Sequence, residues 1–188
     1  MSEKTPLTDM AYVGLDLSLT STGVCMKRGT EITMKTIKTN PKTCDNDLAR
    51  LNYIRDAVMD FIPAGTGMVC QEDFFVPHRA SQIKASIGLI QVGTIVRLGM
   101  LARGLSFYIV SPPQLKKYAT GKGNGPKGLV IREIYKRWGI DAKDDNQADA
   151  CVLAHIAEAI DKQPGFKVHQ YQQDVLDKVI KERPHYNV

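Results

Sequence analysis

The residues best suited to chemistry in this sequence are three acidic side chains that stand in apolar surroundings. Asp16 follows an apolar run in YVGLDLSLTSTGV, Glu72 follows GMVCQ, and Asp149 stands in NQADACVLA. A lone buried carboxylate is costly unless it is paired, protonated or bound to a cation. Hard divalent cations such as Mg²⁺ prefer carboxylate oxygens. The acids come from distant parts of the chain, and together they indicate a divalent-metal cluster.

Each of these acids also has a plain structural explanation when it is taken alone. Asp16 could close a turn, and Glu72 could pair with an arginine. Asp149 could serve the first turn of a helix, where the helix dipole favours negative charge. Their order and their common apolar context favour the metal cluster over separate structural roles.

A basic, glycine-rich stretch, LKKYATGKGNGPK, is the second chemically distinctive part of the sequence. It contains Lys116, Lys117, Lys122 and Lys127 among Gly121, Gly123 and Gly125. This composition predicts a flexible loop whose backbone can approach phosphates, with ammonium groups as point charges. No G-K-[ST] follows, so the stretch does not match a nucleotide-binding P-loop. A solvated basic loop without a ligand is the alternative.

Length and composition are those of an ordinary globular chain with a mild positive charge. The 188 residues predict one domain with a single sizeable core, and 43% of them are hydrophobic. No apolar run is long enough to span a membrane, so no membrane association is expected. The formal charge of +5 favours polyanionic partners. The N-terminus lacks an apolar signal region and the cysteines form no C-x-x-C pair, so we expect a cytoplasmic protein with reduced thiols.

Hydrophobic spacing predicts the elements that must position these residues. The predicted strands are 11–17, 22–28, 31–37, 67–75 and 105–111, and the predicted helices are 47–62, 81–104, 129–139 and the part of 141–160 that follows a loop. Early strands followed by alternating strands and helices predict an α/β fold, a mixed sheet with helices on its faces. Residues 1–10 are a polar leader, 11–160 the domain, and 161–188 a charged tail with one amphipathic helix near 173–181.

Four motifs in a fixed order carry a family resemblance. GLDLSLTSTGV, CQEDFF, SPPQLKKYATGKGNGPK and NQADACVLAHIA resemble the motifs of the RuvC family of Holliday-junction resolvases, in the RNase H-like superfamily. The resemblance covers residues 11–160 and implies an RNase H-like five-stranded mixed sheet, three antiparallel strands then parallel ones, with helices on both faces. It also implies a homodimeric, Mg²⁺-dependent endonuclease that resolves four-way DNA junctions by symmetric paired nicks.

The same resemblance assigns metal ligands to this chain. Asp16, Glu72 and Asp149 match the family acids on the first strand, the fourth strand and the last helix. Asn146 matches a fourth position that carries an acid or a histidine in the family, so it is a departure, and Asp145 is the alternative ligand. Two Mg²⁺ ions about 4 Å apart would activate water and stabilise the leaving oxygen, and Mn²⁺ should substitute. Asp16 would bridge the ions, with Glu72 and Asp149 each holding one.

Contacts to DNA follow from the resemblance as well. Lys116 and Lys127 match family lysines that act near the scissile phosphate, whereas Lys117 and Lys122 are candidates for contacts to the DNA backbone. Phe75 matches a residue that stacks on an unpaired base at the crossover, and core packing is its alternative role. The largely apolar helix 81–104 would form the homodimer interface, which fits a substrate with two-fold symmetry.

Competing functions remain open at this point. DLSLTSTG also resembles the phosphate-binding hairpin of sugar kinases and actin-like ATPases, although 188 residues are too few for their second lobe. Two further candidates are a less selective branched-DNA or flap endonuclease and a catalytically weak junction-binding relative, which Asn146 makes conceivable. The host could be a bacterium or a virus-infected cell, with an organelle as a further setting.

Overall fold

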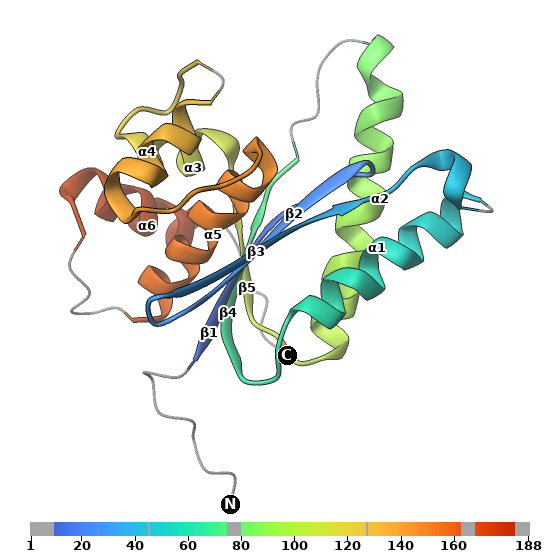
Figure 1. The fold of residues 1–188 in the computed structure, drawn as a ribbon, viewed down its shortest axis with the longest axis horizontal. Coiled ribbons are helices and arrows are strands. Elements are labelled where there is room, and N and C mark those ends of the chain that lie inside the picture. The colour runs from blue at the N-terminus through green and yellow to red at the C-terminus, as the bar shows by residue number, and fades with distance from the viewer. Residues whose placement is uncertain (1–9, 45, 75–79, 127, 163–167, 183–188) are drawn as a thin grey trace, which may run out of the picture.

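Alternating apolar residues build a five-stranded sheet at the centre of the protein (Figure 1). The computed structural model describes residues 10–44, 46–74, 80–126, 128–162 and 168–182. The strands are β1 (Ala11–Asp16), β2 (Ser21–Arg28), β3 (Glu31–Lys38), β4 (Thr66–Glu72) and β5 (Phe107–Val110). Their order is β3-β2-β1-β4-β5, with β1, β2 and β3 antiparallel and with β4 and β5 parallel to β1. This arrangement confirms the predicted mixed sheet.

Helices cover both faces of this sheet, as predicted. They are α1 (Asp47–Phe61), α2 (Ala80–Ala102), α3 (Pro112–Thr120), α4 (Leu129–Trp138), α5 (Asp145–Asp161) and α6 (Gln170–Glu182), with a short 3₁₀ helix at Pro41–Thr43. α1 and α2 lie on one side of the sheet, and α5 with α3, α4 and α6 lies on the other (Figure 1). Each side encloses its own hydrophobic core.

The period-2 alternation of a strand decides which side each residue of β1 faces. Tyr12 belongs to the core beneath α5, while Val13 and Leu15 belong to the core beneath α1 and α2. By the same alternation Gly14 and Asp16 face α5. The strand ends at Asp16, so this carboxylate lies at the end of a buried strand and not at its centre.

The basic stretch differs from its prediction, because its first half is helical. Pro112 and Pro113 open α3, where a missing N–H costs nothing. The Ser111 backbone N–H donates to Gln114 Oε1 at 2.8 Å, which caps the helix start, and Gly121 ends it with φ of 81°. The predicted flexible loop is therefore wrong for residues 115–120, and Lys116 and Lys117 lie on a helix.

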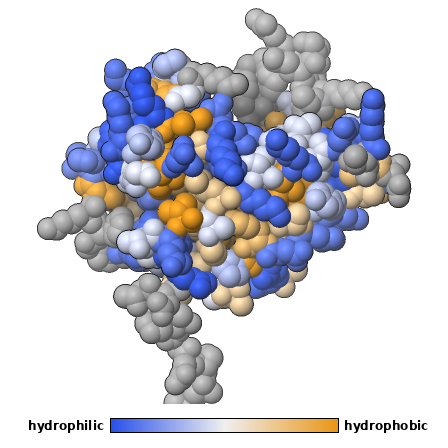
Figure 2. Space-filling view, viewed as in Figure 1, coloured by the Kyte–Doolittle hydropathy of each residue, from blue (hydrophilic) through white to orange (hydrophobic). Residues whose placement is uncertain are grey.

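The last described helix packs against the body of the protein. α6 lies beside α3 and buries Val175, Leu176 and Val179 in the core beneath α5. The domain boundaries at residues 11, 160 and 161 stay predictions. On the face drawn in Figure 2, hydrophilic residues gather toward the edges and a hydrophobic area runs across the middle. No helix of the described residues has the length and apolarity needed to cross a membrane.

Candidate metal centre

Two of the predicted acids meet because they end parallel neighbouring strands. β1 and β4 pair in parallel with Leu15 opposite Gln71, so Asp16 and Glu72 are the next residues along the two strands. On β4, Met68 and Cys70 belong to the core beneath α5, and alternation therefore turns Glu72 to that face as well. Both carboxylates thus project from the carboxyl ends of parallel strands toward α5.

Two glycines let α5 approach the sheet closely enough to add the third acid. A Cβ on Gly14 would lie 1.9 Å from the carbonyl oxygen of Ala150, and a Cβ on Gly23 would lie 2.1 Å from that of Asn146. Only residues without a side chain fit at these points. The first turns of α5 therefore rest directly on β1 and β2, which carries Asp149 to the ends of the strands.

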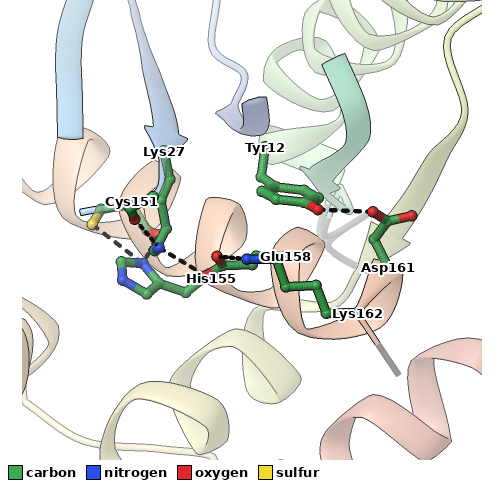
Figure 3. Close-up of polar contacts among 8 residues, drawn as sticks. Tyr12, Lys27, Cys151, His155, Glu158, Asp161 and Lys162 are labelled. Atoms are coloured by element: carbon green, nitrogen blue, oxygen red, sulfur yellow. Dashed lines mark hydrogen bonds and ion pairs between the residues drawn. The ribbon is translucent and has the colours of Figure 1, made fainter. Parts of the chain in front are cut away.

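Polar contacts hold the C-terminal half of α5 against the sheet (Figure 3). Glu158, whose side chain is 5% exposed, pairs with Lys27 of β2 at 2.8 Å and with Lys162 at 2.6 Å. The Tyr12 hydroxyl of β1 donates to Asp161 Oδ2 at 2.8 Å. A buried carboxylate needs partners of this kind to be tolerated. These contacts hold α5 in place along β1 and β2, and they support the placement of Asp149.

Asp16, Glu72 and Asp149 form one compact acidic cluster. Each contributes a carboxylate oxygen, and these oxygens all lie within 4.8 Å of one another. All three residues are partly buried, so each oxygen can still reach a ligand. Within the described residues, this is the group of acids, cysteines and histidines that could hold a metal ion.

Burial disfavours the charged form of all three acids in the cluster and raises their pKa values. Burial raises the pKa of Asp149 from 3.8 to about 7, and the charges of Asp16 and Asp145 add to the rise. Burial, followed by the charge of Asp16, also raises the pKa of Glu72, and burial raises that of Asp16. The interaction between the two carboxyl groups also raises the pKa of Glu72 and lowers that of Asp16.

The donor set fits a hard divalent cation. Three clustered carboxylates repel one another, and a divalent cation would replace the protons that otherwise relieve this repulsion. Oxygen-only ligands that retain room for water are those that Mg²⁺ favours, and Mn²⁺ accepts the same ligands. The residues present therefore fit the metal centre that the sequence predicted, while the identity and number of ions belong to the proposal below.

Lys116 lies beside the acids on α3. Its charge lowers the pKa of both Glu72 and Asp149, which opposes the effect of burial. With Asp145 and Asp149 it lines a cavity of about 280 Å³, closed on another side by Gly125, Pro126, Gly128 and Val130. This cavity joins the acid cluster to the basic stretch, and it can admit an anionic group next to the acids.

Asn146 and Asp145 occupy different surroundings at the start of α5. The Asn146 amide Nδ2 donates to Ser21 Oγ at 2.8 Å, which ties the side chain to the start of β2 and leaves Oδ1 as the possible ligand atom. Asp145 lies at the cavity with Lys116, and its charge raises the pKa of Asp149. Each residue therefore remains a candidate fourth ligand.

The other predicted DNA contacts are spread more widely. The Lys117 ammonium lies 3.5 Å from Asp174 of α6, and Lys122 is exposed just beyond the end of α3. Phe75 and Lys127 lie outside the described residues. Of the predicted lysines, Lys116 is the one that the described structure brings to the acids.

Asp144, which directly precedes α5, completes the surroundings of the cluster. Asp144 caps α5 by accepting from the Gln147 N–H at 2.8 Å, and it accepts from the Thr36 hydroxyl of β3 at 2.8 Å. Its charge also raises the pKa of Asp16. The cap could be predicted from an aspartate before an apolar helix. The partnership with Thr36 could not, because it joins residues far apart in the chain.

Solved structures with this fold are known. RuvC from T. thermophilus in complex with a Holliday junction substrate matches with a TM-score of 0.65 and 13% identity, over 94% of this chain and 99% of that chain. A second Thermus thermophilus RuvC structure matches with a TM-score of 0.63 and 19% identity, over 77% of this chain and 91% of that chain. No protein-family model matches the sequence, and neither does any curated protein. The structural matches confirm the RuvC-like fold, an RNase H-like α/β architecture, that the motifs predicted.

Proposed function

We propose that this protein is a metal-dependent endodeoxyribonuclease that resolves four-way DNA junctions by symmetric paired nicks. The observation that carries the proposal is the convergence of Asp16, Glu72 and Asp149 within 4.8 Å on a RuvC-like fold. A matching RuvC structure contains a Holliday junction substrate. Acids gathered at the ends of parallel strands, with an adjacent lysine, are suited to phosphodiester hydrolysis.

The proposed mechanism gives each acid a role in holding metal. Asp16 would hold both Mg²⁺ ions, Glu72 and Asp149 would each hold one of them, and Asn146 or Asp145 would be the fourth ligand. When bound, the ions supply an activated water and neutralise the leaving 3′-oxygen. Lys116 places its ammonium group beside the acids, where it can bind an oxygen of the scissile phosphate.

DNA would reach the centre across the basic stretch. Lys116 faces the cavity at the acids, while Lys117 and Lys122 lie farther along and can contact the backbone of an arm. Lys127 near the scissile phosphate and Phe75 stacked on an unpaired base complete the proposed contacts. Each lysine that contacts a phosphate should add about 0.9 to the slope of log affinity against log salt concentration.

A homodimer would match the two-fold symmetry of a four-way junction. α2 carries Ile87, Ile90 and Leu98, which are 50%, 44% and 60% exposed, so its outer side is unusually apolar for a free surface. A second copy docked on this side would cover those residues and present a second metal centre for the opposing strand. We place the protein in the cytoplasm, where chromosomal or viral DNA recombines in bacteria.

Substrate competition tests this function. Cleavage of a four-way junction, a flap and a linear duplex should be compared at equal concentration with Mg²⁺ and with Mn²⁺. Paired nicks confined to the junction would support the proposal. Equal cleavage of the flap would identify a less selective branched-DNA endonuclease. ATP hydrolysis without DNA cleavage would favour the alternative hypothesis, that DLSLTSTG is the phosphate-binding hairpin of a sugar kinase or actin-like ATPase.

A further inference from the structure

α2 contacts the chain segments that follow two of the three acids. Leu19 comes three residues after Asp16, and a Cβ on Gly88 would lie 2.2 Å from its Cδ1. Phe74 comes two residues after Glu72, and a Cβ on Gly93 would lie 1.8 Å from its Cζ. Both glycines are buried, so each forms a socket that is filled by one apolar side chain. We refer to them as the Leu19 socket and the Phe74 socket.

Arg97 reinforces the Phe74 socket from one helical turn away. Its guanidinium carbon lies 5.0 Å from the centre of the Phe74 ring, a cation–π distance. Its Nε lies 3.3 Å from the side-chain amide of Gln71, which is completely buried and directly precedes Glu72. Arg97 therefore contacts Gln71, directly before Glu72, and Phe74, two residues after it. Both contacts lie on the side of the sheet opposite the metal centre.

The Leu19 socket is held from a second direction as well. Arg50 of α1 is buried, and its guanidinium donates to the Leu19 carbonyl oxygen at 2.5 Å and to the Thr39 hydroxyl at 2.9 Å. The turn after Asp16 is thus fixed by its side chain in α2 and by its backbone at α1. Neither contact reaches the acids themselves, so these residues can act only through position.

We propose that α2 positions the metal centre, with Gly88, Gly93 and Arg97 setting the separation of Asp16 and Glu72 by holding Leu19 and Phe74. The proposal rests on the metal centre proposed above and adds residues on the opposite side of the sheet to its function. They are positioning residues, because they touch the segments that carry the acids and not the ligand. Filling a socket should weaken metal binding without unfolding the protein.

Gly93→Ala is the direct test, and Gly99→Ala is its matched control. Both replace a glycine inside α2, where alanine normally favours the helix. A Cβ at position 99 meets the flexible Met59 side chain of α1 at 3.1 Å, far from the acids. Mn²⁺ affinity of the full chain should be measured by calorimetry at neutral pH, with circular dichroism and the melting temperature as checks of folding.

We expect Gly93→Ala to weaken Mn²⁺ binding by about 10-fold or more, as residues behind a metal site do, while Gly99→Ala binds as the wild type does. Adding Phe74→Leu to Gly93→Ala should recover affinity, because leucine lacks the ring atoms that the new Cβ would meet. Arg97→Met tests the same point without crowding, since it removes the charge and keeps an unbranched apolar stem. It should also weaken Mn²⁺ binding in a folded protein.

Wild-type Mn²⁺ affinity in both Gly93→Ala and Arg97→Met would overturn the proposal, as would an equal loss in Gly99→Ala. Failure of the double variant to recover any affinity would contradict the socket as the cause. A wild type that binds Mn²⁺ but cuts no junction would refute the proposed activity alone, because the affinities still report on positioning. A wild type that binds no Mn²⁺ would overturn both.

Discussion

Asp149→Asn should stabilise the metal-free protein at alkaline pH. The pKa of Asp149 rises from 3.8 to about 7 in the folded state, mainly because of burial and the neighbouring acids. An acid with a raised folded pKa binds more protons when folded than when unfolded, so stability falls as pH increases from about 4 to about 8. At about 1.4 kcal/mol for each unit of pKa, the charge costs at most about 4 kcal/mol at pH 8.

Urea unfolding in EDTA at pH 4.5 and pH 8 measures this effect. The wild type should lose stability between pH 4.5 and pH 8, and Asp149→Asn should lose less. At pH 8 the difference between the two losses should approach about 4 kcal/mol. Asp177→Asn on the exposed side of α6 is the control and should follow the wild type. At pH 8, added Mg²⁺ should stabilise the wild type and leave Asp149→Asn nearly unchanged.

Equal pH dependence of the wild type and Asp149→Asn would refute this reasoning, because the carboxylate would then carry no electrostatic cost for a cation to relieve. A wild type that becomes more stable between pH 4.5 and pH 8 without metal would contradict it as well. Either result would remove the physical basis for assigning a metal centre to these acids.

Single contacts elsewhere in the protein lead to further predictions. Gly14→Ala should destabilise the protein by about 3 kcal/mol in urea unfolding, because the new Cβ meets the backbone of α5, which cannot rotate away. Glu158→Gln should cost about 3 kcal/mol by leaving Lys27 and Lys162 without their buried partner. The folded pKa of Glu158 is lowered, so its carboxylate stabilises the protein less as the pH falls. The difference in unfolding free energy between that variant and the wild type should therefore shrink at acidic pH. Lys116→Met should slow single-turnover junction cleavage by about 100-fold while Mg²⁺ still stabilises the protein.

The acid cluster was accessible from sequence because its residues break a local pattern. Asp16 and Glu72 stand at the ends of apolar strands and Asp149 interrupts an apolar helix, so each is anomalous where it stands. Strand alternation then predicts which face the first two share. The distances among them depend on Gly14 and on how closely α5 can approach β1, which are properties of packing and not of any short segment.

The basic stretch shows where local reasoning failed. Its glycines predicted a loop, but Leu115 and Tyr118 are buried and Gln114 caps the start of α3, so burial and capping favour a helix. The contacts of Arg97 with Phe74 and Gln71 were equally inaccessible, because they join α2 to β4 and to the segment that follows β4. Long-range partners of this kind leave no periodic signal in the sequence.

Mapping the nicks on a synthetic four-way junction tests the proposed activity most directly. The wild type and Asp16→Asn should be incubated with the junction in Mg²⁺, with binding followed by gel shift and the cleavage sites mapped on denaturing gels. We predict that both proteins bind, and that the wild type alone nicks two opposing strands at symmetric positions. A wild type that binds the junction but never cuts it, even in Mn²⁺, would contradict a metal-dependent resolvase, and so would cleavage by Asp16→Asn at the wild-type rate.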